Sequence, residues 1–257
     1  MDITERKRAE EALESRVRLE FLAATIGLAL AQADTIGQGL QQSAEAIIYY
    51  AGAAFVRIWT RNELTGELGL EASAGAHTDA YLPHASVPIG KVVIGRIAQL
   101  NEPHLSNDVP NDPDICDREW AKQEGMVGFA GYPLTLDGRT VGVATAFSRK
   151  PFGEPIPQAF ALMSIQLAQF VTRKRAELQL LKAKEAAEAS SRAQSDYLAN
   201  MNFKIRNALN GIIGMTESVI DTELNSHQRD DLHIILESAN SLRKIVDDVP
   251  DFFKIVK

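Results

Sequence analysis

The feature that most constrains the fold of this chain is a long stretch without helix breakers. No proline occurs between Pro157 and Thr222, and residues that favour helix dominate this stretch. If it is unbroken, such a helix would extend for about 100 Å at about 1.5 Å of rise per residue. A monomeric globule of 257 residues does not easily accommodate it, so the pattern predicts a coiled coil or helical bundle.

Apolar residues near the end of this stretch form a narrow seam. On the long helix, steps of three and four residues join Leu198, Met201, Ile205, Leu209, Ile212, Thr216 and Val219. The segment "DTELNSHQ" breaks the helix, and a second helix is predicted from Asp230 to Asp248. Its seam contains Leu232, Ile235, Ala239, Leu242, Ile245 and Val249.

Two such helices with a short connection form an antiparallel hairpin that still exposes apolar surface. Pairing two hairpins into a four-helix bundle buries this surface, with roughly 1.5–3 kcal/mol available per fully buried large side chain. We therefore predict a homodimer. Between Lys182 and Ser195 the seam weakens to alanine and charged residues, so we expect that segment to be loosely coupled.

The first 150 residues have a different pattern. Helices are predicted over 2–33, where Asp2 and Glu5 form a capping box, and over 36–50. Short β-rich segments follow at "AAFVRIWTRN", "GELGLEASAGA", "MVGFAGYPLTL" and "RTVGVATAFSR". The dipeptide Asp137–Gly138 joins the last two as a hairpin. We predict that residues 19–150 form an α+β unit, an antiparallel sheet flanked by helices.

Composition narrows the class of protein. The net charge is −7 and the pI is near 5.3, which disfavours a nucleic-acid partner. The single cysteine, Cys116, excludes an internal disulfide framework and is typical of a reducing compartment. No apolar run approaches the roughly 18 residues of a membrane span. We expect a soluble, cytoplasmic protein without membrane insertion.

Three stretches resemble known signalling families. "DITERKRAEEAL" resembles the exit helix of a PAS domain, and "NDVPNDPDI", "DREWAKQEGMVGFAGYPL" and "GRTVGVATAFSRKPF" resemble a GAF domain. "LANM", "IR", "LNGIIGM" and "DTEL" resemble the dimerisation and phosphotransfer (DHp) domain of hybrid sensor histidine kinases. The resemblance implies an N-terminal helix at 1–18, a GAF domain at 19–155, a signalling helix at 156–196 and a DHp-like hairpin at 197–257.

The resemblance also shows what is missing. The family pattern reads Met-Ser-His-Glu-Ile-Arg-Thr-Pro-Leu-Asn-Gly, and here it is Met201, Asn202, Phe203, Lys204, Ile205, Arg206, Asn207, Ala208, Leu209, Asn210 and Gly211. In the family the histidine attacks the γ-phosphoryl group of ATP and the next acid orients it. Phe203 has no nucleophilic nitrogen, and Lys204 reverses the charge of that acid. Asn207 and Ala208 replace the threonine and the proline.

A second component of a kinase is also absent from the sequence. No GxxxxGK[ST] or GxGxxG motif occurs, and nothing before Lys257 resembles the family's ATP-binding domain. We therefore expect no autophosphorylation by this chain and no catalytic residue. The five histidines, at 77, 84, 104, 227 and 233, are interpreted as structural or exposed, with no metal site.

GAF domains often hold a small ligand, so the resemblance implies a pocket, for which Tyr81, Trp120 and Phe129 are candidates. Trp120 and Phe129 are more simply explained as core aromatics. Asp117 follows Cys116 where bilin attachment needs histidine, and the cyclic-nucleotide signature is absent. A redox reductase of the free-methionine type needs several cysteines. No cofactor is evident, and a small ligand stays unidentified.

Three functions remain open at this point. The first is a GAF sensor joined to a dimeric bundle that cannot phosphorylate itself, a pseudokinase whose partner is an active histidine kinase or a response regulator. The second is an altered part of an active hybrid kinase, in which restoring Phe203→His and Lys204→Glu would restore phosphorylation. The third is a structural dimeriser without a ligand.

Overall fold

The computed structural model describes residues 3–76, 85–116 and 118–254, with side chains from Leu13 to Asp247 within those ranges. The chain divides into two compact units, Met1–Leu178 and Gln179–Lys257. We call them the sheet unit and the hairpin unit, and describe each by itself. The helix α5 (Pro155–Ile220) contributes residues to both.

The sheet unit is built on one antiparallel sheet with the strand order β3-β2-β1-β6-β5-β4. The strands are β1 (Phe55–Arg61), β2 (Leu68–Gly75), β3 (Ser86–Val87), β4 (His104–Ser106), β5 (Gly128–Leu136) and β6 (Arg139–Ser148). β1 pairs with β6 although most of the unit separates them in sequence. This non-local pairing joins the β3-β2-β1 half of the sheet to the β6-β5-β4 half.

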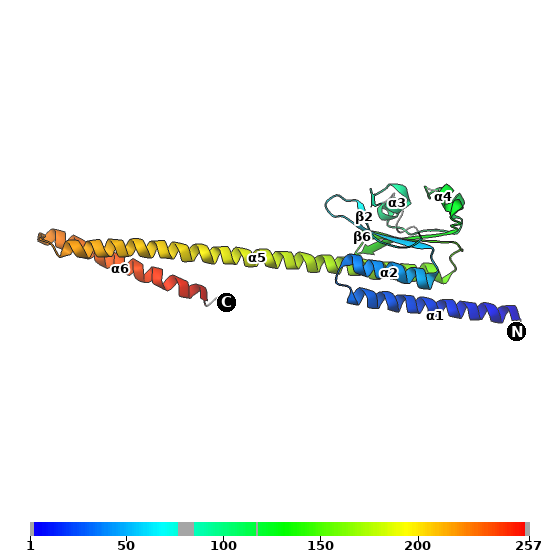
Figure 1. The fold of residues 1–257 in the computed structure, drawn as a ribbon, viewed down its shortest axis with the longest axis horizontal. Coiled ribbons are helices and arrows are strands. Elements are labelled where there is room, and N and C mark those ends of the chain that lie inside the picture. Colours follow the sequence, from blue (N-terminus) through cyan, green and yellow to red (C-terminus); the bar gives the residue numbers. More distant parts are fainter. Residues whose placement is uncertain (1–2, 77–84, 117, 255–257) are drawn as a thin grey trace. The chain divides into compact units, whose positions relative to one another are not determined.

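Helices cover both faces of the sheet (Figure 1). On one face lie α1 (Ile3–Gln32), α2 (Ile36–Ala51) and the start of α5, and on the other lie α3 (Val92–Leu100) and α4 (Arg118–Gln123). A 3₁₀ turn, η1 (Val109–Asn111), precedes α4. The predicted α+β class, with an antiparallel sheet between helices, is confirmed.

The sheet separates two apolar cores. The larger packs the α1/α2/α5 side and includes Leu22, Ile26, Leu40, Val56 and Ile58, all fully buried or nearly so. The smaller lies under α3 and α4 and is richer in aromatic side chains, with Phe55, Trp59 and Phe129 as members. Successive residues of β1 alternate between these two cores, as the two-residue period of a strand requires.

The predicted Asp137–Gly138 hairpin is present between β5 and β6. Both residues have positive φ, 49° at Asp137 and 74° at Gly138, as the mirror-image turns of two-residue hairpins require. The short strands β3 and β4 were not predicted. Each has three residues or fewer, too few for an alternation pattern to be recognised in a sequence.

The start of α5 belongs to the larger core of the sheet unit. Phe160, Met163, Leu167, Phe170 and Val171 are all buried there, although the sequence analysis assigned 156–196 to a signalling linker. Their three- and four-residue spacing is that of a helix face packed on a sheet, and it continues without a break into the exposed part of the helix.

The hairpin unit pairs the C-terminal part of α5 with α6 (Ser226–Lys254). Leu209 and Ile213 of α5 pack with Ala239 and Val246 of α6. An ion pair joins the helices, with 2.9 Å between Arg206 Nε and Asp247 Oδ1. The sheet and hairpin architectures together confirm the predicted fold of each unit.

The predicted limits of the second helix were wrong at both ends. α6 begins at Ser226 rather than Asp230, because Asn225 caps it: the Gln228 backbone N–H donates to Asn225 Oδ1 at 2.9 Å, and the Asn225 N–H donates to Gln228 Oε1 at 3.1 Å. The helix also continues through Pro250, since a proline removes one backbone donor without ending every helix that contains it.

Gly142 provides a test of the packing in the middle of the sheet. A Cβ added there would lie 2.2 Å from the backbone oxygen of Trp59, so we expect Gly142→Ala to destabilise the sheet unit by about 1–3 kcal/mol. Both tryptophans, Trp59 and Trp120, lie in this unit, so their fluorescence during urea unfolding reports on it selectively.

Gly69→Ala is the matched control, because its added Cβ would meet only the Thr60 oxygen, at 4.0 Å. We expect its effect to stay within about 0.5 kcal/mol. Equal unfolding midpoints for the two variants would contradict this description of the sheet.

Candidate functional site

The sheet face under α3 and α4 carries a cluster of aromatic rings. Phe55 stacks on Phe147 with centroids 4.6 Å apart, and Trp120 packs edge-on against both, at 5.5 and 5.8 Å. Phe129 lies edge-on to Phe147 at 4.8 Å. Because β1, β6, β5 and α4 each contribute one ring, the cluster ties α4 to three adjacent strands.

The predicted pocket residues have different environments. Phe129 is only 1% exposed and belongs to the aromatic core. Trp120 is half-buried at the edge of the same core, and Tyr81 lies outside the described residues. Phe129 and Trp120 thus share one core, and a ligand role for either stays a prediction.

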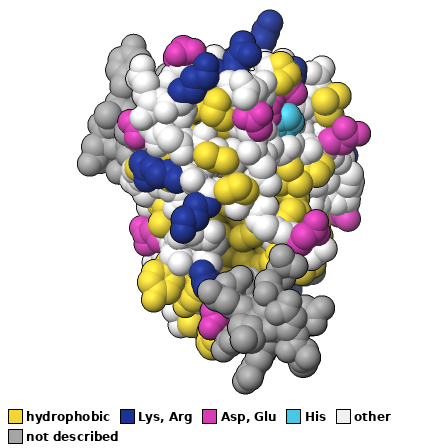
Figure 2. Space-filling view, turned by 90° about the vertical axis from the view of Figure 1, so that its right-hand side faces the viewer, with side chains coloured by type: hydrophobic (Ala, Val, Ile, Leu, Met, Phe, Trp, Pro, Cys, Tyr) yellow, Lys and Arg dark blue, Asp and Glu magenta, His cyan; other side chains and the backbone are white. Residues whose placement is uncertain are grey.

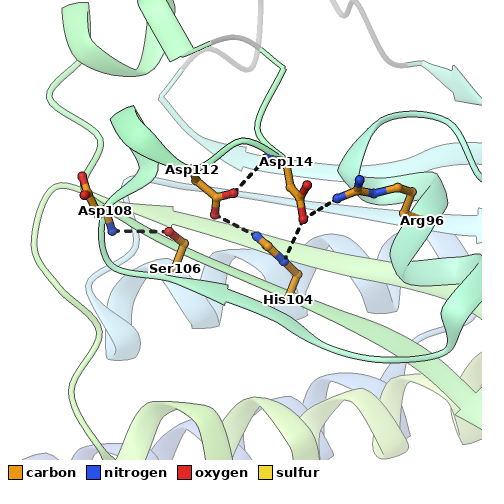
Figure 3. Close-up of polar contacts among 6 residues, drawn as sticks. All are labelled: Arg96, His104, Ser106, Asp108, Asp112 and Asp114. Carbon is orange, nitrogen blue, oxygen red and sulfur yellow. Dashed lines mark hydrogen bonds and ion pairs between the residues drawn. The ribbon is translucent and has the colours of Figure 1, made fainter.

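A charged network lies beside this cluster, at the end of the sheet (Figure 3). His104 on β4 stands between two carboxylates, with 2.8 Å from Nε2 to Asp112 Oδ2 and 3.8 Å from Nδ1 to Asp114 Oδ2. Arg96 of α3 forms a close ion pair with Asp114. The network therefore connects α3, β4 and the segment that leads to α4.

The environment of each carboxyl sets its acidity. Burial by itself would raise the pKa of Asp112, but hydrogen bonds from the Asp114 backbone N–H, His104 and Ser106 outweigh it, so the pKa is lowered. The hydrogen bond from Arg96 is the main cause that lowers the pKa of Asp114. Both groups are therefore carboxylates at neutral pH.

This cluster was not predicted from the sequence, from which His104 was interpreted as structural or exposed. One ligand atom from each of His104, Asp112 and Asp114 lies within 4.8 Å of the others, which is a donor set that a divalent cation accepts. Arg96 already neutralises Asp114, however, and both imidazole nitrogens face carboxylates. The arrangement is that of a structural network of hydrogen bonds and ion pairs.

Two open depressions lie along α1 in the sheet unit. One, of about 740 Å³, runs between α1 and the start of α5 and includes Leu19, Ala23 and Leu162. The other, of about 560 Å³, lies at the ends of α2 and β6. Neither is lined by Trp120 or Phe129. On the face shown in Figure 2, described basic and acidic side chains are interspersed among apolar ones.

The hairpin unit carries the positions where the sequence departs from the DHp pattern. Phe203, Lys204 and Asn207 all lie on the exposed surface of α5, and Phe203 is 63% exposed. Phe203 and Asn207 are four residues apart and so lie on one face of the helix. Neither Phe203 nor Lys204 has the side chain that the family's pattern places at its position.

The predicted seam is divided between two surfaces. Leu209 is buried against α6, with Ile205 half-buried beside it, whereas Met201, Ile212 and Val219 are 39–47% exposed. On α6, Leu232 is half-buried, and Ile235, Leu242 and Ile245 are 46–60% exposed. Leu198 is half-buried, and the side chain of Val249 lies outside the described part. About half of the described seam residues thus remain exposed on the surface of the hairpin unit.

The two histidines of the hairpin unit do not replace the missing one. Both His227 and His233 are exposed on α6. His227 Nδ1 lies 3.2 Å from Asp231 Oδ2 in an exposed pair one helical turn apart. Neither lies on α5, where the family holds its phosphoacceptor, in agreement with their interpretation as surface residues.

Comparison with known families matches both units. The GAF domain family matches residues 36–172, and the His Kinase A (phospho-acceptor) domain matches residues 193–256. Among the described residues, no helix is both long and apolar enough to cross a membrane.

Similar curated proteins are histidine kinases. The chain is 47% identical over 73 residues to the signal transduction histidine-protein kinase BarA of Escherichia coli, covering 28% of this chain and 8% of that protein. It is 48% identical over 75 residues to the sensor histidine kinase GacS of Pseudomonas protegens, covering 29% and 8%. The sensor protein TorS of E. coli matches at 40% over 95 residues, covering 35% and 10%. The chain thus spans about a tenth or less of these relatives.

Solved structures support the fold of the sheet unit. The GAF domain of a phosphoenolpyruvate-protein phosphotransferase from Coxiella burnetii superposes with a TM-score of 0.56 at 20% identity, over 63% of this chain and 96% of that one. The A. aeolicus nlh2 GAF domain gives 0.54 at 17% identity, over 62% and 99%. At these identities the likeness concerns the fold alone.

The acidity of Asp112 predicts how the sheet unit responds to pH. We expect Asp112→Asn to destabilise the unit by about 1–2 kcal/mol at pH 7, because charge-assisted hydrogen bonds are lost. A lowered pKa stabilises the fold above the ordinary aspartate value of about 3.9 and loses that effect as pH falls through the folded value. The difference between the native chain and the variant should therefore shrink below about pH 4.

Urea unfolding followed by tryptophan fluorescence at pH 7 and pH 3.5 measures this difference. Asp108→Asn is the control, because Asp108 is exposed and accepts a hydrogen bond from the Asn111 side chain. A destabilisation by Asp112→Asn that does not change with pH would exclude the proposed electrostatic origin.

Proposed function

The chain belongs to the GAF domain family and carries a His Kinase A (phospho-acceptor) domain, and from this premise we propose that it is a sensor module of two-component signalling that cannot phosphorylate itself. Its GAF domain would sense a small ligand, and its helical hairpin would dimerise and transmit the change. The output would be a contact with a partner rather than a phosphoryl transfer.

One observation supports this proposal: the hairpin keeps its packed core although the residues at the phosphoacceptor positions are changed. Phe203 and Lys204 stand exposed where the family has its nucleophile and acid, whereas Leu209 and Ile213 still form the hairpin core. A side chain without a nucleophilic nitrogen accepts no phosphoryl group. What remains is a folded helical surface, and a protein partner is the ligand that suits it.

The exposed half of the seam supports a homodimer. Met201, Ile212 and Val219 on α5, with Leu242 and Ile245 on α6, are large apolar side chains between 39% and 60% exposed. A contiguous apolar surface on a helical hairpin is typical of a protein interface. A second copy of the hairpin offers the same stripe, so a two-fold symmetric four-helix bundle would cover both.

The segment between the two cores supports the transmission step. Every residue from Ala176 to Tyr197 is exposed, so no side chain of this part of α5 is held in either core. A helix with few tertiary contacts has low local stability and responds readily to changes at its ends. In the proposed mechanism, ligand binding shifts the packing of the first turns of α5, and the hairpin receives the shift.

Two classes of partner suit such a module. Pairing with an active histidine kinase would place one inert and one active hairpin in the same bundle, and thereby control the active one. Holding a response regulator would instead use the exposed α5 surface around Phe203. We propose these two classes of partner because the family's hairpin binds both kinds of protein. In either case the partner would contact the hairpin unit alone.

A second candidate function rests on the similarity to active kinases. Identity of 47–48% to BarA and GacS over more than 70 residues favours an origin as part of a working hybrid kinase. In that case the departures at Phe203 and Lys204 would be recent, and the rest of the site would still be competent.

The dimer is tested at the exposed seam. We expect the double variant Ile212→Glu, Leu242→Glu to weaken self-association at least about a hundredfold, because two apolar contacts are lost and charges are placed in the interface. Sedimentation equilibrium measures the dissociation constant. Phe203→Glu is the matched control, since Phe203 is exposed but lies off the seam. A monomeric native chain, or equal weakening by the control, would refute the bundle.

The two candidate functions are separated by a phosphorylation assay. The chain is mixed with labelled ATP and the ATP-binding domain of an active relative, whose own phosphoacceptor domain is the positive control. We expect no acid-labile label on the native chain, since Phe203 is not a nucleophile. We also expect none on a folded, dimeric Phe203→His, Lys204→Glu variant, because a hairpin used only for docking need not keep the rest of the site.

Labelling of that double variant would favour the second candidate, whereas labelling of the native chain would refute both. Circular dichroism and sedimentation establish first that the variant is folded and dimeric, so that a negative result concerns chemistry rather than stability.

A further inference from the structure

A row of polar side chains crosses the sheet inside the smaller core. Strand register places Ser73 of β2 opposite Arg57 of β1, and Arg57 opposite Thr145 of β6. Thr145 is opposite Gly131 of β5, which is opposite His104 of β4. Residues directly opposite one another in antiparallel strands point to the same face. The row therefore lies on the face covered by α3 and α4.

The rows on either side are apolar. One contains Phe55, Phe147 and Phe129, and the other contains Leu70, Trp59 and Val143. All of these side chains belong to the smaller core or pack against it. A polar stripe between two apolar rows is unusual inside a core, because a buried polar group is stable only when it is hydrogen-bonded.

Arg57 is the member of the row that has a buried nitrogen without a hydrogen-bond partner. It is half-buried, and its Nε is buried without a hydrogen-bond partner. Its guanidinium carbon lies 5.4 Å from the centroid of the Phe55 ring, and no ion pair of Arg57 exists among the described residues. Burial lowers the pKa of Arg57. Arg96, another arginine over this face, is paired with Asp114.

Packing differs along the row. At Gly131 the helix α3 comes so close that an added Cβ would lie 2.4 Å from Ile97 Cδ1. Thr145 is 1% exposed, whereas Arg57 and Ser73 remain partly exposed. The row is therefore closed at its centre and accessible at Arg57 and Ser73.

We propose that Arg57 binds the carboxylate or phosphate group of a small anionic ligand on the sheet, with the partly exposed Ser73 hydroxyl as a neighbouring donor. A guanidinium presents parallel N–H groups that match two oxygens of such an anion. The rings of Phe55 and Phe147 would contact the apolar part of the same molecule. The inference rests on the proposed function, because it names the class of ligand that the GAF domain would sense.

A structural role for Arg57 is the competing explanation. An unpaired, half-buried cation destabilises a fold, and an apolar side chain of similar length would fill the same space at lower free energy. An anion that pairs with the guanidinium would remove this penalty. Removal of the Arg57 charge should therefore stabilise the ligand-free fold, and it should abolish the stabilisation that a bound anion provides.

The test uses thermal unfolding of the full chain, followed by tryptophan fluorescence at constant ionic strength. Sodium benzoate and inorganic phosphate are the anionic probes, and benzamide is the neutral counterpart of benzoate. The variants are Arg57→Met and the control Arg61→Met, which removes an exposed arginine from the same strand. Arg57→Lys keeps the charge without the planar fork and tests whether the guanidinium geometry matters.

We expect benzoate or phosphate to raise the Tm of the native chain saturably, by about 5 °C or more at a hundredfold excess over Kd. Benzamide should have no such effect. Arg61→Met should respond as the native chain does, Arg57→Met should not respond, and Arg57→Lys should bind at least about tenfold more weakly. Without added anion, Arg57→Met should melt no lower than the native chain.

If benzoate raises the Tm, the ligand carries a carboxylate; if phosphate raises it, the ligand carries a phosphate group. Absence of a saturable response to either, or an equal response in Arg57→Met, overturns the proposal, and so does a lower Tm of anion-free Arg57→Met. Sedimentation of the same samples reports the dimer, which the proposed function requires whether or not an anion binds. Loss of the anion effect with the dimer intact would thus refute this inference alone.

Discussion

The structure depends on one uninterrupted ladder of backbone hydrogen bonds, that of α5. At its beginning Phe160, Met163 and Leu167 complete the core of the GAF domain, and near its end Leu209 and Ile213 form the core of the hairpin. One helix therefore contributes side chains to two cores. The exposed residues between them belong to neither core, so this part of the helix is stabilised mainly by its own backbone hydrogen bonds and helix propensity.

The apolar seam of the hairpin is wider than the contact between α5 and α6. An antiparallel pair of helices buries only the residues on the line between their axes, here Leu209 and Ile213 against Ala239 and Val246. Residues one step around the helix, such as Ile212 and Leu242, are left half-exposed. The sequence pattern merges these two sets, because steps of three and four describe a helix face that is wider than this contact. The structure separates the buried set from the exposed set.

What the sequence predicted well was local, and what it missed was not. A run without helix breakers and the Asp137–Gly138 turn require only neighbouring residues, so both were found. The contact of His104 with Asp112 and Asp114 depends on how a proline-containing loop returns to the sheet. The row through Ser73, Arg57 and Thr145 depends on the register of three strands, of which β6 is far in sequence from β1 and β2. Neither leaves a periodic signal within a window of sequence.

Departures from a pattern have different meanings at the two units. Phe203 and Lys204 are exposed, so replacing a histidine and an acid there left the hairpin core unchanged, and the fold itself gives no reason to restore them. Arg57 is the opposite case, because its half-buried guanidinium has no ion-pair partner among the described residues, and such a charge opposes folding. A side chain that the fold does not require is best explained by what it binds. The hairpin therefore keeps its packing although its phosphoacceptor pattern is altered, while the GAF domain contains a polar group that its packing does not need.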